Sequence, residues 1–300
     1  MRYTHLFLVE LLAEGLTKRF GKTVALDNVS FRIERKGCYG YLGPNGAGKT
    51  TTMKIFTNLL RPTAGHAYIN NVNVQREPVR ALRSVGSLVE DPEPYGYLSV
   101  REFIEYAARI RGVSKPDIEY LKNRLDLPEL GKRCSNLSKG QRRRVFLAAL
   151  VAQDTEILIL DEPSSGLDPK EAQILRDLIK DLKRERVVLL SSHLLYEVSI
   201  VCDYLYFIYN GRLVEQGSVE DVSKKFTSKA LRVEFYSKPE RLEGVLNTNF
   251  VFEGERTIVI HYDGSDEQRR KILDSLYPLG LRSFSDAELG LEEAYRKVIG

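Results

Sequence analysis

The sequence predicts an α/β fold in which parallel strands alternate with helices, followed by a smaller second domain. Residues 157–160 and 187–190 are continuous apolar runs with the length and composition of buried strands. The segment between them, "EAQILRDLIKDLKRE", has the spacing of an amphipathic helix. A strand, a helix and a strand at this spacing indicate a βαβ unit and therefore a parallel sheet. The pattern changes near residue 222, which predicts domains at 1–222 and 223–300.

The other elements follow from periodicity. Residues 8–13 and 24–33 alternate apolar and polar side chains, as half-buried strands do. A strand from Cys38 leads into a glycine-rich loop, and a helix from Thr51 is expected to end before Pro62. Helical spacing dominates a subdomain at about 91–153. The tail suggests a strand, a hairpin, a helix, a further strand and a last helix.

Composition excludes several classes of protein. The 45 basic and 41 acidic residues give a net charge of +4, which is too balanced to indicate nucleic-acid binding. Cys38, Cys134 and Cys202 lack the spacing of a metal site or a disulfide framework, so free thiols in a reducing compartment are expected. No apolar run approaches the ~18 residues of a membrane span, and the N-terminus is a poor signal peptide. We therefore expect a cytoplasmic chain that works at a membrane only through another protein.

A phosphate-binding loop is the most specific motif. "GPNGAGKT" matches G-x-x-x-x-G-K-T between a predicted strand and a predicted helix, which is the context this motif requires. Backbone N–H groups and the positive end of the helix would hold phosphates. Lys49 would reach the β- and γ-phosphates, and the Thr50 hydroxyl would bind Mg²⁺. The residues expected to bind the nucleotide here are Gly43, Pro44, Asn45, Gly46, Ala47, Gly48, Lys49, Thr50 and Thr51.

Two adjacent carboxylates supply the other half of the site. "ILILDEP" is a buried strand that ends in Asp161, where a carboxylate can join the Mg²⁺ shell. Glu162 follows directly and can orient and deprotonate the attacking water. Without the phosphate-binding loop, the same letters could be no more than the polar end of a strand. Together the two motifs indicate hydrolysis of Mg-ATP or Mg-GTP.

The stretch "NLSKGQRRRV" predicts a second anion site. Ser138 can cap a helix, Gln141 completes a capping box, and Gly140 lets the backbone approach a guest. Three arginines near the positive end of a helix are unfavourable, and an anion would relieve this. The alternative is an ordinary capping box with a basic first turn. Because the glycine-rich loop already encloses its own phosphates, the second site suits a nucleotide held by a second, identical chain.

The motifs "GPNGAGKTT", "LSKGQ", "LILDEPSSGLDP" and "SSH", in this order and spacing, resemble the ATP-binding subunit of an ABC transporter over about residues 9–220. The resemblance implies a P-loop NTPase core of the ABC ATPase type, a mixed sheet with helices plus a helical subdomain, here followed by a small C-terminal α+β domain. It implies ATP and Mg²⁺ as ligands and two ATPase domains that close head-to-tail on two ATP molecules. It also implies a separate membrane permease, which would place the chain on the inner face of the cell membrane.

The resemblance also assigns roles to single residues. Ser138, Gly140 and Gln141 would form the signature that touches the nucleotide of the partner, and Asp168 would link the two sites. His193 would lie by the γ-phosphate and help to hold the water; taken alone it is an ordinary histidine at the end of a strand. Phe20 would stack on adenine, although a half-buried strand aromatic would look the same.

Glu90 departs from the family pattern, because the loop after "VGSLV" usually carries Gln. A carboxylate there is tolerable if it ligates Mg²⁺ or stays at a distance, and we expect it to ligate Mg²⁺. Some drug- and peptide-antibiotic-export ATPases look similar at this loop, which favours an exporter, and residues 91–98 would contact the permease.

Two other classes of function are weaker fits. A soluble ABC-type ATPase acting on ribosomes or nucleic acid would usually carry two sets of motifs or a long coiled coil, and this chain has one set and no sustained heptads. A nucleoside kinase or a GTPase would not explain the signature or His193.

Overall fold

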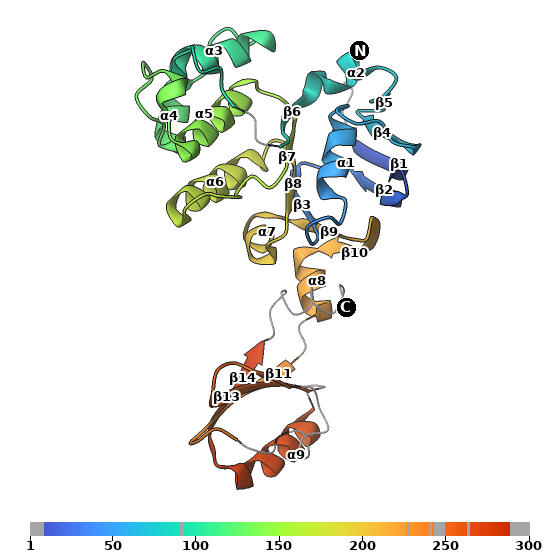
Figure 1. The fold of residues 1–300 in the computed structure, drawn as a ribbon, viewed down its shortest axis with the longest axis vertical. Helices are drawn as coiled ribbons and strands as arrows, with labels where there is room; N and C mark the ends of the chain where they lie inside the picture. The colour runs from blue at the N-terminus through green and yellow to red at the C-terminus, as the bar shows by residue number, and fades with distance from the viewer. Residues whose placement is uncertain are drawn as a thin grey trace, which may run out of the picture. The chain divides into compact units, whose positions relative to one another are not determined.

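A computed structural model describes residues 9–90, 93–226, 229–239, 242, 250–262 and 265–288. The chain divides into two units, Met1–Val219 and Glu220–Gly300. Figure 1 shows the ribbon of each unit. The division falls close to the boundary that the sequence places near residue 222.

The central sheet of the first unit carries the nucleotide motifs. Its strands, in spatial order, are β10 (Arg212–Ser218), β9 (Tyr204–Tyr209), β3 (Gly37–Leu42), β8 (Val187–Ser192), β7 (Ile157–Leu160) and β6 (Val85–Leu88). All neighbours are parallel except β10 and β9. Every residue of β7 and β8 is buried, which explains their continuous apolar sequences. Helix α6 (Pro169–Leu182) connects these two strands, so the predicted βαβ unit is confirmed.

A second sheet packs beside the first. Its order is β2 (Thr23–Ile33), β1 (Leu11–Phe20), β4 (Ala64–Ile69) and β5 (Val72–Asn73), all antiparallel. The strand predicted at 8–13 was too short, because pairing with β2 extends β1 to Phe20, opposite Thr23. Phe31 of β2 fills the space between the sheets, with its ring 5.0 Å from that of Tyr206 and 5.6 Å from that of Phe56.

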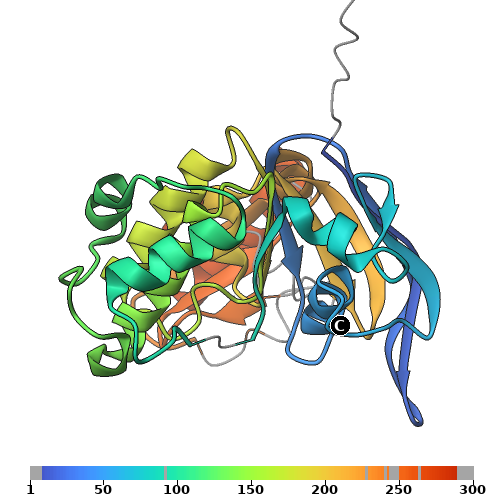
Figure 2. The same cartoon turned by 90° about the horizontal axis from the view of Figure 1, so that it is seen from above.

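Helices flank the sheets of the first unit. They are α1 (Lys49–Phe56), α2 (Pro78–Ala81), α3 (Val100–Ile110), α4 (Ile118–Leu125), α5 (Lys139–Ala152), α6 and α7 (Leu195–Val201), with short 3₁₀ turns at Leu82–Ser84 and Cys134–Asn136. The predicted helical subdomain is confirmed over its described residues, where α3 and α4 pack on α5. Figures 1 and 2 show these three helices together, on the side of the sheet away from β1 and β2.

Helix α1 is shorter than the sequence predicted. It ends at Phe56, and the backbone then turns through Asn58, which has a left-handed φ of 56°. The Thr57 hydroxyl donates to the Met53 carbonyl at 2.9 Å, and such local bonding by Thr competes with further helix. The nucleotide-binding helix is therefore two turns long.

The second unit begins with most of α8 (Val219–Phe226) and contains its own sheet. The strand order is β12 (Phe250–Phe252), β13 (Thr257–His261), β11 (Lys229–Phe235) and β14 (Leu281–Glu288). Helix α9 (Asp266–Leu276) and the 3₁₀ turn Tyr277–Leu279 precede β14. Ile272 and Leu276 of α9 share a core with the buried residues of β11 and β13. The predicted strand, hairpin, helix and strand are confirmed, and the last predicted helix lies outside the described residues.

The three cysteines are free and buried. The Sγ atoms of Cys38 and Cys202 lie 3.4 Å apart, and burial raises the pKa of the Cys202 thiol. Among the described residues, no helix has both the length and the hydropathy needed to cross a membrane.

Candidate active site

The glycine-rich loop joins β3 to α1 and leaves the start of that helix open. Gly48 is the N-cap residue, with φ 111°, and as a glycine it has no side chain with which to cap the helix. A Cβ atom at Gly48 would lie 2.6 Å from the Ala25 carbonyl oxygen, so both the backbone angle and the space require glycine. The uncapped N–H groups and the helix dipole can therefore serve a phosphate.

Lys49 is buried and folds back onto the loop. Its Nζ donates to the carbonyl oxygens of Gly43 at 2.7 Å and Pro44 at 3.1 Å. The same Nζ lies 3.2 Å from the Glu162 carboxylate. A phosphate arriving at the loop would offer Lys49 a stronger, doubly charged partner.

A pocket of about 290 Å³ brings the predicted motifs together. It is lined by Ala25, Asn45, Gly46, Gly48, Lys49, Thr50, Thr51, Glu162, Ser165 and His193. The loop, the carboxylate after β7 and the histidine after β8 come from three separate parts of the sequence, and all follow the carboxyl ends of parallel strands. Ligands bind at this edge in open α/β sheets.

Glu162 is held from several directions. Its backbone has a left-handed φ of 45°, which is uncommon outside glycine. The Ser191 hydroxyl accepts from its N–H at 2.9 Å, and Arg143 Nη2 donates to its carbonyl at 2.8 Å. One carboxylate oxygen lies 2.9 Å from His193 Nδ1. The strained backbone and fixed side chain place one carboxylate at the pocket in a defined position.

The residues expected to bind Mg²⁺ present suitable oxygens. Asp161 is buried, and its carboxylate accepts from the Ser191 hydroxyl at 2.5 Å. Thr50 lies in the first turn of α1 and lines the pocket. Mg²⁺ binds through one or two carboxylates together with waters and substrate phosphates. The donor set of Asp161 and Thr50 fits that chemistry.

The signature residues lie apart from this pocket. Ser138 caps α5 by accepting from the Gln141 N–H at 3.2 Å, and Gln141 Oε1 accepts from the Ser138 N–H at 3.1 Å, so the predicted capping box is confirmed. Among the described residues that line the pocket, none belongs to the signature. Figures 1 and 2 both show α5 separated from α1. The chain therefore does not bring its own signature to its own phosphate-binding loop.

Comparisons with known proteins decide the family. The family model "ABC transporter" matches residues 26–165. An uncharacterised ABC transporter ATP-binding protein of Bacillus subtilis, YcbN, is 32% identical over 295 residues, which is 95% of each chain. The chain belongs to the ATP-binding proteins of ABC transporters. It is accordingly an ATPase, and ATP is its nucleotide.

Other matches to this ABC ATPase agree. The lantibiotic transport ATP-binding protein SrtF of Streptococcus pyogenes is 34% identical, over 82% of this chain and all of that protein. The bacitracin transport ATP-binding protein BcrA of Bacillus licheniformis is 35% identical, over 70% of each. A solved structure of an ATP-binding subunit of an ABC transporter superposes with a TM-score of 0.65 at 28% identity, covering 72% of this chain and 92% of that one.

Other residues expected in the site of this ABC ATPase do not line the pocket: Gly43, Pro44, Ala47 and Asp161 lie in the motifs beside it, and Phe20, Asp168 and Glu90 lie elsewhere in the unit. Phe20 is half exposed at the end of β1, with Lys18 Nζ 5.0 Å from the centre of its ring. Asp168 caps α6, where the Glu171 N–H donates to its carboxylate at 2.8 Å. Glu90 forms an ion pair with Lys54.

The arginines of the signature helix correct one inference from the sequence. The sequence predicts that their charge favours an incoming anion, but each has a partner in its own chain: Arg142 lies 3.8 Å from Glu93, Arg143 bonds backbone carbonyls, and Arg144 pairs with Glu171. A Cβ atom at Gly140 would clash with a carboxylate oxygen of Glu171, so a larger residue here would displace the end of that side chain. What remains for a partner's nucleotide is the first turn of α5, which the Ser138 side chain caps.

Arg143 was missed as a site residue. Its Nε donates to the Pro163 carbonyl at 3.0 Å, in addition to the bond from Nη2 to Glu162. The guanidinium group thus supports the backbone on which the carboxylate of Glu162 is mounted, and it ties the signature helix to that carboxylate. The run "QRRRV" gave no sign of which arginine would do so.

Arg143→Ala is expected to lower kcat by about tenfold or more while the KM for ATP changes little. Misplacing a reacting group by about 1 Å can cost ~10²-fold, and the two lost bonds support the backbone at Glu162 and Pro163 and not the phosphate loop. Steady-state ATPase kinetics measure both constants. Arg109→Ala, which removes an exposed arginine from α3, is the control. An unchanged kcat in Arg143→Ala would contradict the role.

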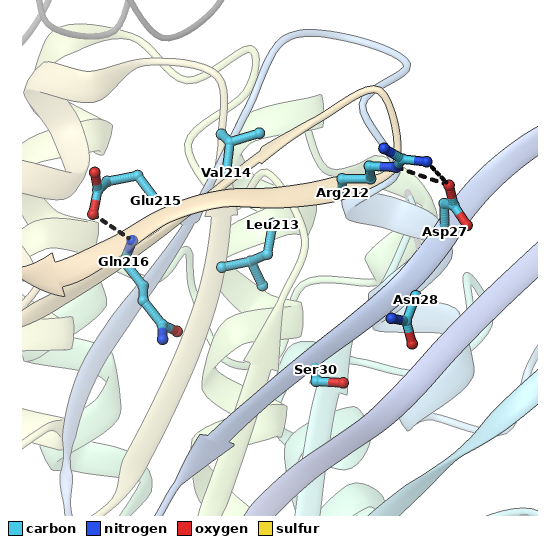
Figure 3. Close-up of a pocket in the computed structure, with 8 residues that line it drawn as sticks. All are labelled: Asp27, Asn28, Ser30, Arg212, Leu213, Val214, Glu215 and Gln216. Atoms are coloured by element: carbon cyan, nitrogen blue, oxygen red, sulfur yellow. Dashed lines mark hydrogen bonds and ion pairs between the residues drawn. The ribbon is translucent and has the colours of Figure 1, made fainter.

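A second, larger groove lies elsewhere on the first unit. It has a volume of about 750 Å³ between β2 and β10 and shares no lining residue with the nucleotide pocket. Figure 3 shows Asp27 and Arg212 joined at one end of the groove, where Nε donates to the carboxylate at 2.8 Å. Its charged side chains thus have partners within the fold.

Proposed function

We propose that two copies of this ABC ATPase close head-to-tail on two Mg-ATP molecules and drive a separate membrane permease, in the direction of export. The observation that carries the dimer is the separation of the two phosphate sites within one chain. A signature that lies apart from its own loop can act only on a nucleotide that another subunit holds, and a two-fold dimer lets each copy complete the other's site.

Within one subunit, the phosphate-binding loop and Lys49 hold the β- and γ-phosphates of ATP. Glu162 then accepts a proton from the attacking water, and His193 keeps the carboxylate in place through the 2.9 Å contact. Bound by Thr50 and Asp161, Mg²⁺ would offset the phosphate charge. Each of these residues acts before or during the transfer of the γ-phosphate to water.

Across the dimer, the partner's copies of Ser138 and Gly140 would contact the γ-phosphate. Arg144 and Glu171 join α5 to the start of α6, where Asp168 is the cap. Release of the γ-phosphate would therefore shift the signature helix and Asp168 together. Closure on ATP and opening after hydrolysis are the movements that a permease could use.

The surface proposed for the permease is the stretch at 91–98, of which 91 and 92 lie outside the described residues. Tyr95 and Tyr97 stack with ring centres 5.8 Å apart, and Tyr106 of α3 meets Tyr95 edge-on at 5.8 Å. All three are exposed, Tyr97 by 70%. A cluster of exposed aromatic side chains suits a protein partner.

Two observations support transport and its direction. Relatives that are named for lantibiotic and bacitracin transport cover most of this chain, which favours a peptide-like or drug-like cargo. The carboxylate at position 90 also follows the pattern expected for exporters. The chain would work at the inner face of the membrane, bound to the permease.

Purification of trapped complexes tests this proposal. A tagged Glu162→Gln variant is expressed in its native cell, membranes are solubilised gently with Mg-ATP present, and co-purifying proteins are identified by mass spectrometry. A multi-span membrane protein in near-equal amount, reduced in a Lys49→Ala control, is the expected result. Ribosomal or DNA-bound partners without a membrane protein would contradict the transport role and favour a soluble ABC-type ATPase.

A further inference from the structure

Glu90 lies at the edge of the sheet that carries the active site. Strand β6 ends at Leu88, whose carbonyl accepts from the Asp161 N–H at 2.7 Å. Glu90 follows two residues later, with a left-handed φ of 67°. The pairing of Leu88 with Leu160 therefore places the backbone of Glu90 beside the segment that carries Asp161 and Glu162, although the Glu90 side chain does not line the nucleotide pocket.

Lys54 places a positive charge beside the Glu90 carboxylate. It lies on α1, four residues after Thr50 and hence on the same face of the helix. Its ammonium group forms an ion pair with the Glu90 carboxylate. The pair joins the phosphate-binding helix directly to the segment between β6 and the helical subdomain, across 36 residues of sequence.

Stability alone does not explain this pair. The Glu90 side chain is 63% exposed and that of Lys54 is 28% exposed. Ion pairs in such positions contribute little to folding. Neither residue lines the nucleotide pocket, but Lys54 lies one helical turn after Thr50, which does, so an uncompensated carboxylate at Glu90 would oppose the binding of a polyanion there.

We propose that Lys54 is a positioning residue for ATP hydrolysis that acts through Glu90. By pairing with the Glu90 carboxylate, the Lys54 ammonium group neutralises its charge, and it anchors the segment after β6 to the nucleotide-binding helix. The proposal rests on the ATPase function argued above. It replaces the expectation that Glu90 itself ligates Mg²⁺ with a pairing inside the protein.

A double-mutant cycle tests the pair. Wild type, Lys54→Met, Glu90→Gln and the double variant are compared by kcat/KM for ATP and by the Mg²⁺ concentration that gives half-maximal rate. Lys54→Met should lower kcat/KM by about tenfold, within the range of coupling energies between residues in contact. Glu90→Gln should change it by less than about threefold, because it removes the charge that Lys54 compensates. The double variant should match Glu90→Gln, since without the carboxylate there is nothing left to neutralise.

Rescue of Lys54→Met by the second substitution is the decisive result, because a merely structural lysine would not be rescued in this way. Lys271→Met, which breaks an exposed ion pair in the second unit, is the control and should leave the rate unchanged. A double variant as slow as Lys54→Met, or a normal rate in Lys54→Met, would overturn the proposal. So would a tenfold rise in the half-saturating Mg²⁺ concentration in Glu90→Gln, which would return Glu90 to the metal. If wild type itself failed to hydrolyse ATP, this would contradict the ATPase function and also the role of the Lys54–Glu90 pair in it.

Discussion

Glu162→Gln is expected to bind ATP as well as wild type and to hydrolyse it about 10²–10⁴-fold more slowly, the usual contribution of a general base. The amide keeps the size of the side chain and can still approach Lys49 and His193, but it cannot accept the proton of the attacking water. Phosphate release gives the rate, and titration with a fluorescent ATP analogue gives the affinity.

The matched control for this variant is Glu185→Gln, which makes the same change at an exposed position beyond α6. It should hydrolyse ATP like wild type. A Glu162→Gln variant with a near-normal rate would show that another group deprotonates the water, and the role assigned to the His193 contact would then fail as well.

Lys49→Ala is expected to weaken ATP binding by about 10- to 100-fold, because hydrogen bonds to charged groups contribute about 1.5–3 kcal/mol. In the absence of nucleotide, Lys49 bonds the carbonyls of its own loop and approaches Glu162, so it exchanges those partners for phosphate oxygens on binding. Isothermal titration calorimetry with ATP measures the loss.

Lys36→Ala removes an exposed lysine before β3 and should bind ATP normally. Unchanged affinity in Lys49→Ala would mean that the loop backbone alone holds the phosphates. The lysine would then serve only to hold Glu162 in the nucleotide-free protein.

The parts of the site that the sequence predicted are encoded locally. The loop at 43–50 and the caps of α5 and α6 depend on residues a few positions apart, so their spacing can be read directly. The buried strand before Asp161 was equally clear, because every residue of β7 is apolar and buried within the sheet. These features needed no knowledge of the partner elements.

The parts that the sequence left open depend on packing between distant segments. Arg143 reaches the Glu162 carbonyl across 19 residues, and nothing in the run of three arginines distinguishes it from its neighbours. The apolar spacing of α1 predicted a helix and its buried face, but it gave no partner for Lys54. The length of β1 is fixed by pairing with β2, which extends it well beyond its alternating segment.

Gly140 belongs to the predicted signature motif, and the packing of its own chain gives a second reason for a small residue there. The sequence suggested that glycine lets the backbone approach a guest, and the structure shows that the Glu171 carboxylate already occupies the space beside it. The Glu171 carboxylate in turn pairs with Arg144 and accepts from the Asp168 N–H at 3.4 Å. The signature is thus constrained from within the chain as well as by any nucleotide that it contacts.

The mass of the Glu162→Gln variant in solution, measured by light scattering with and without Mg-ATP, shows whether two chains share each nucleotide site. We expect a monomer without nucleotide and a dimer with one ATP per chain in its presence. Adding Ser138→Arg should abolish the dimer, yet leave each chain able to bind ATP through its own loop, with the melting temperature checked because Ser138 also caps α5. A nucleotide-bound Glu162→Gln chain that stays monomeric, or a dimer that Ser138→Arg does not weaken, would contradict a shared site.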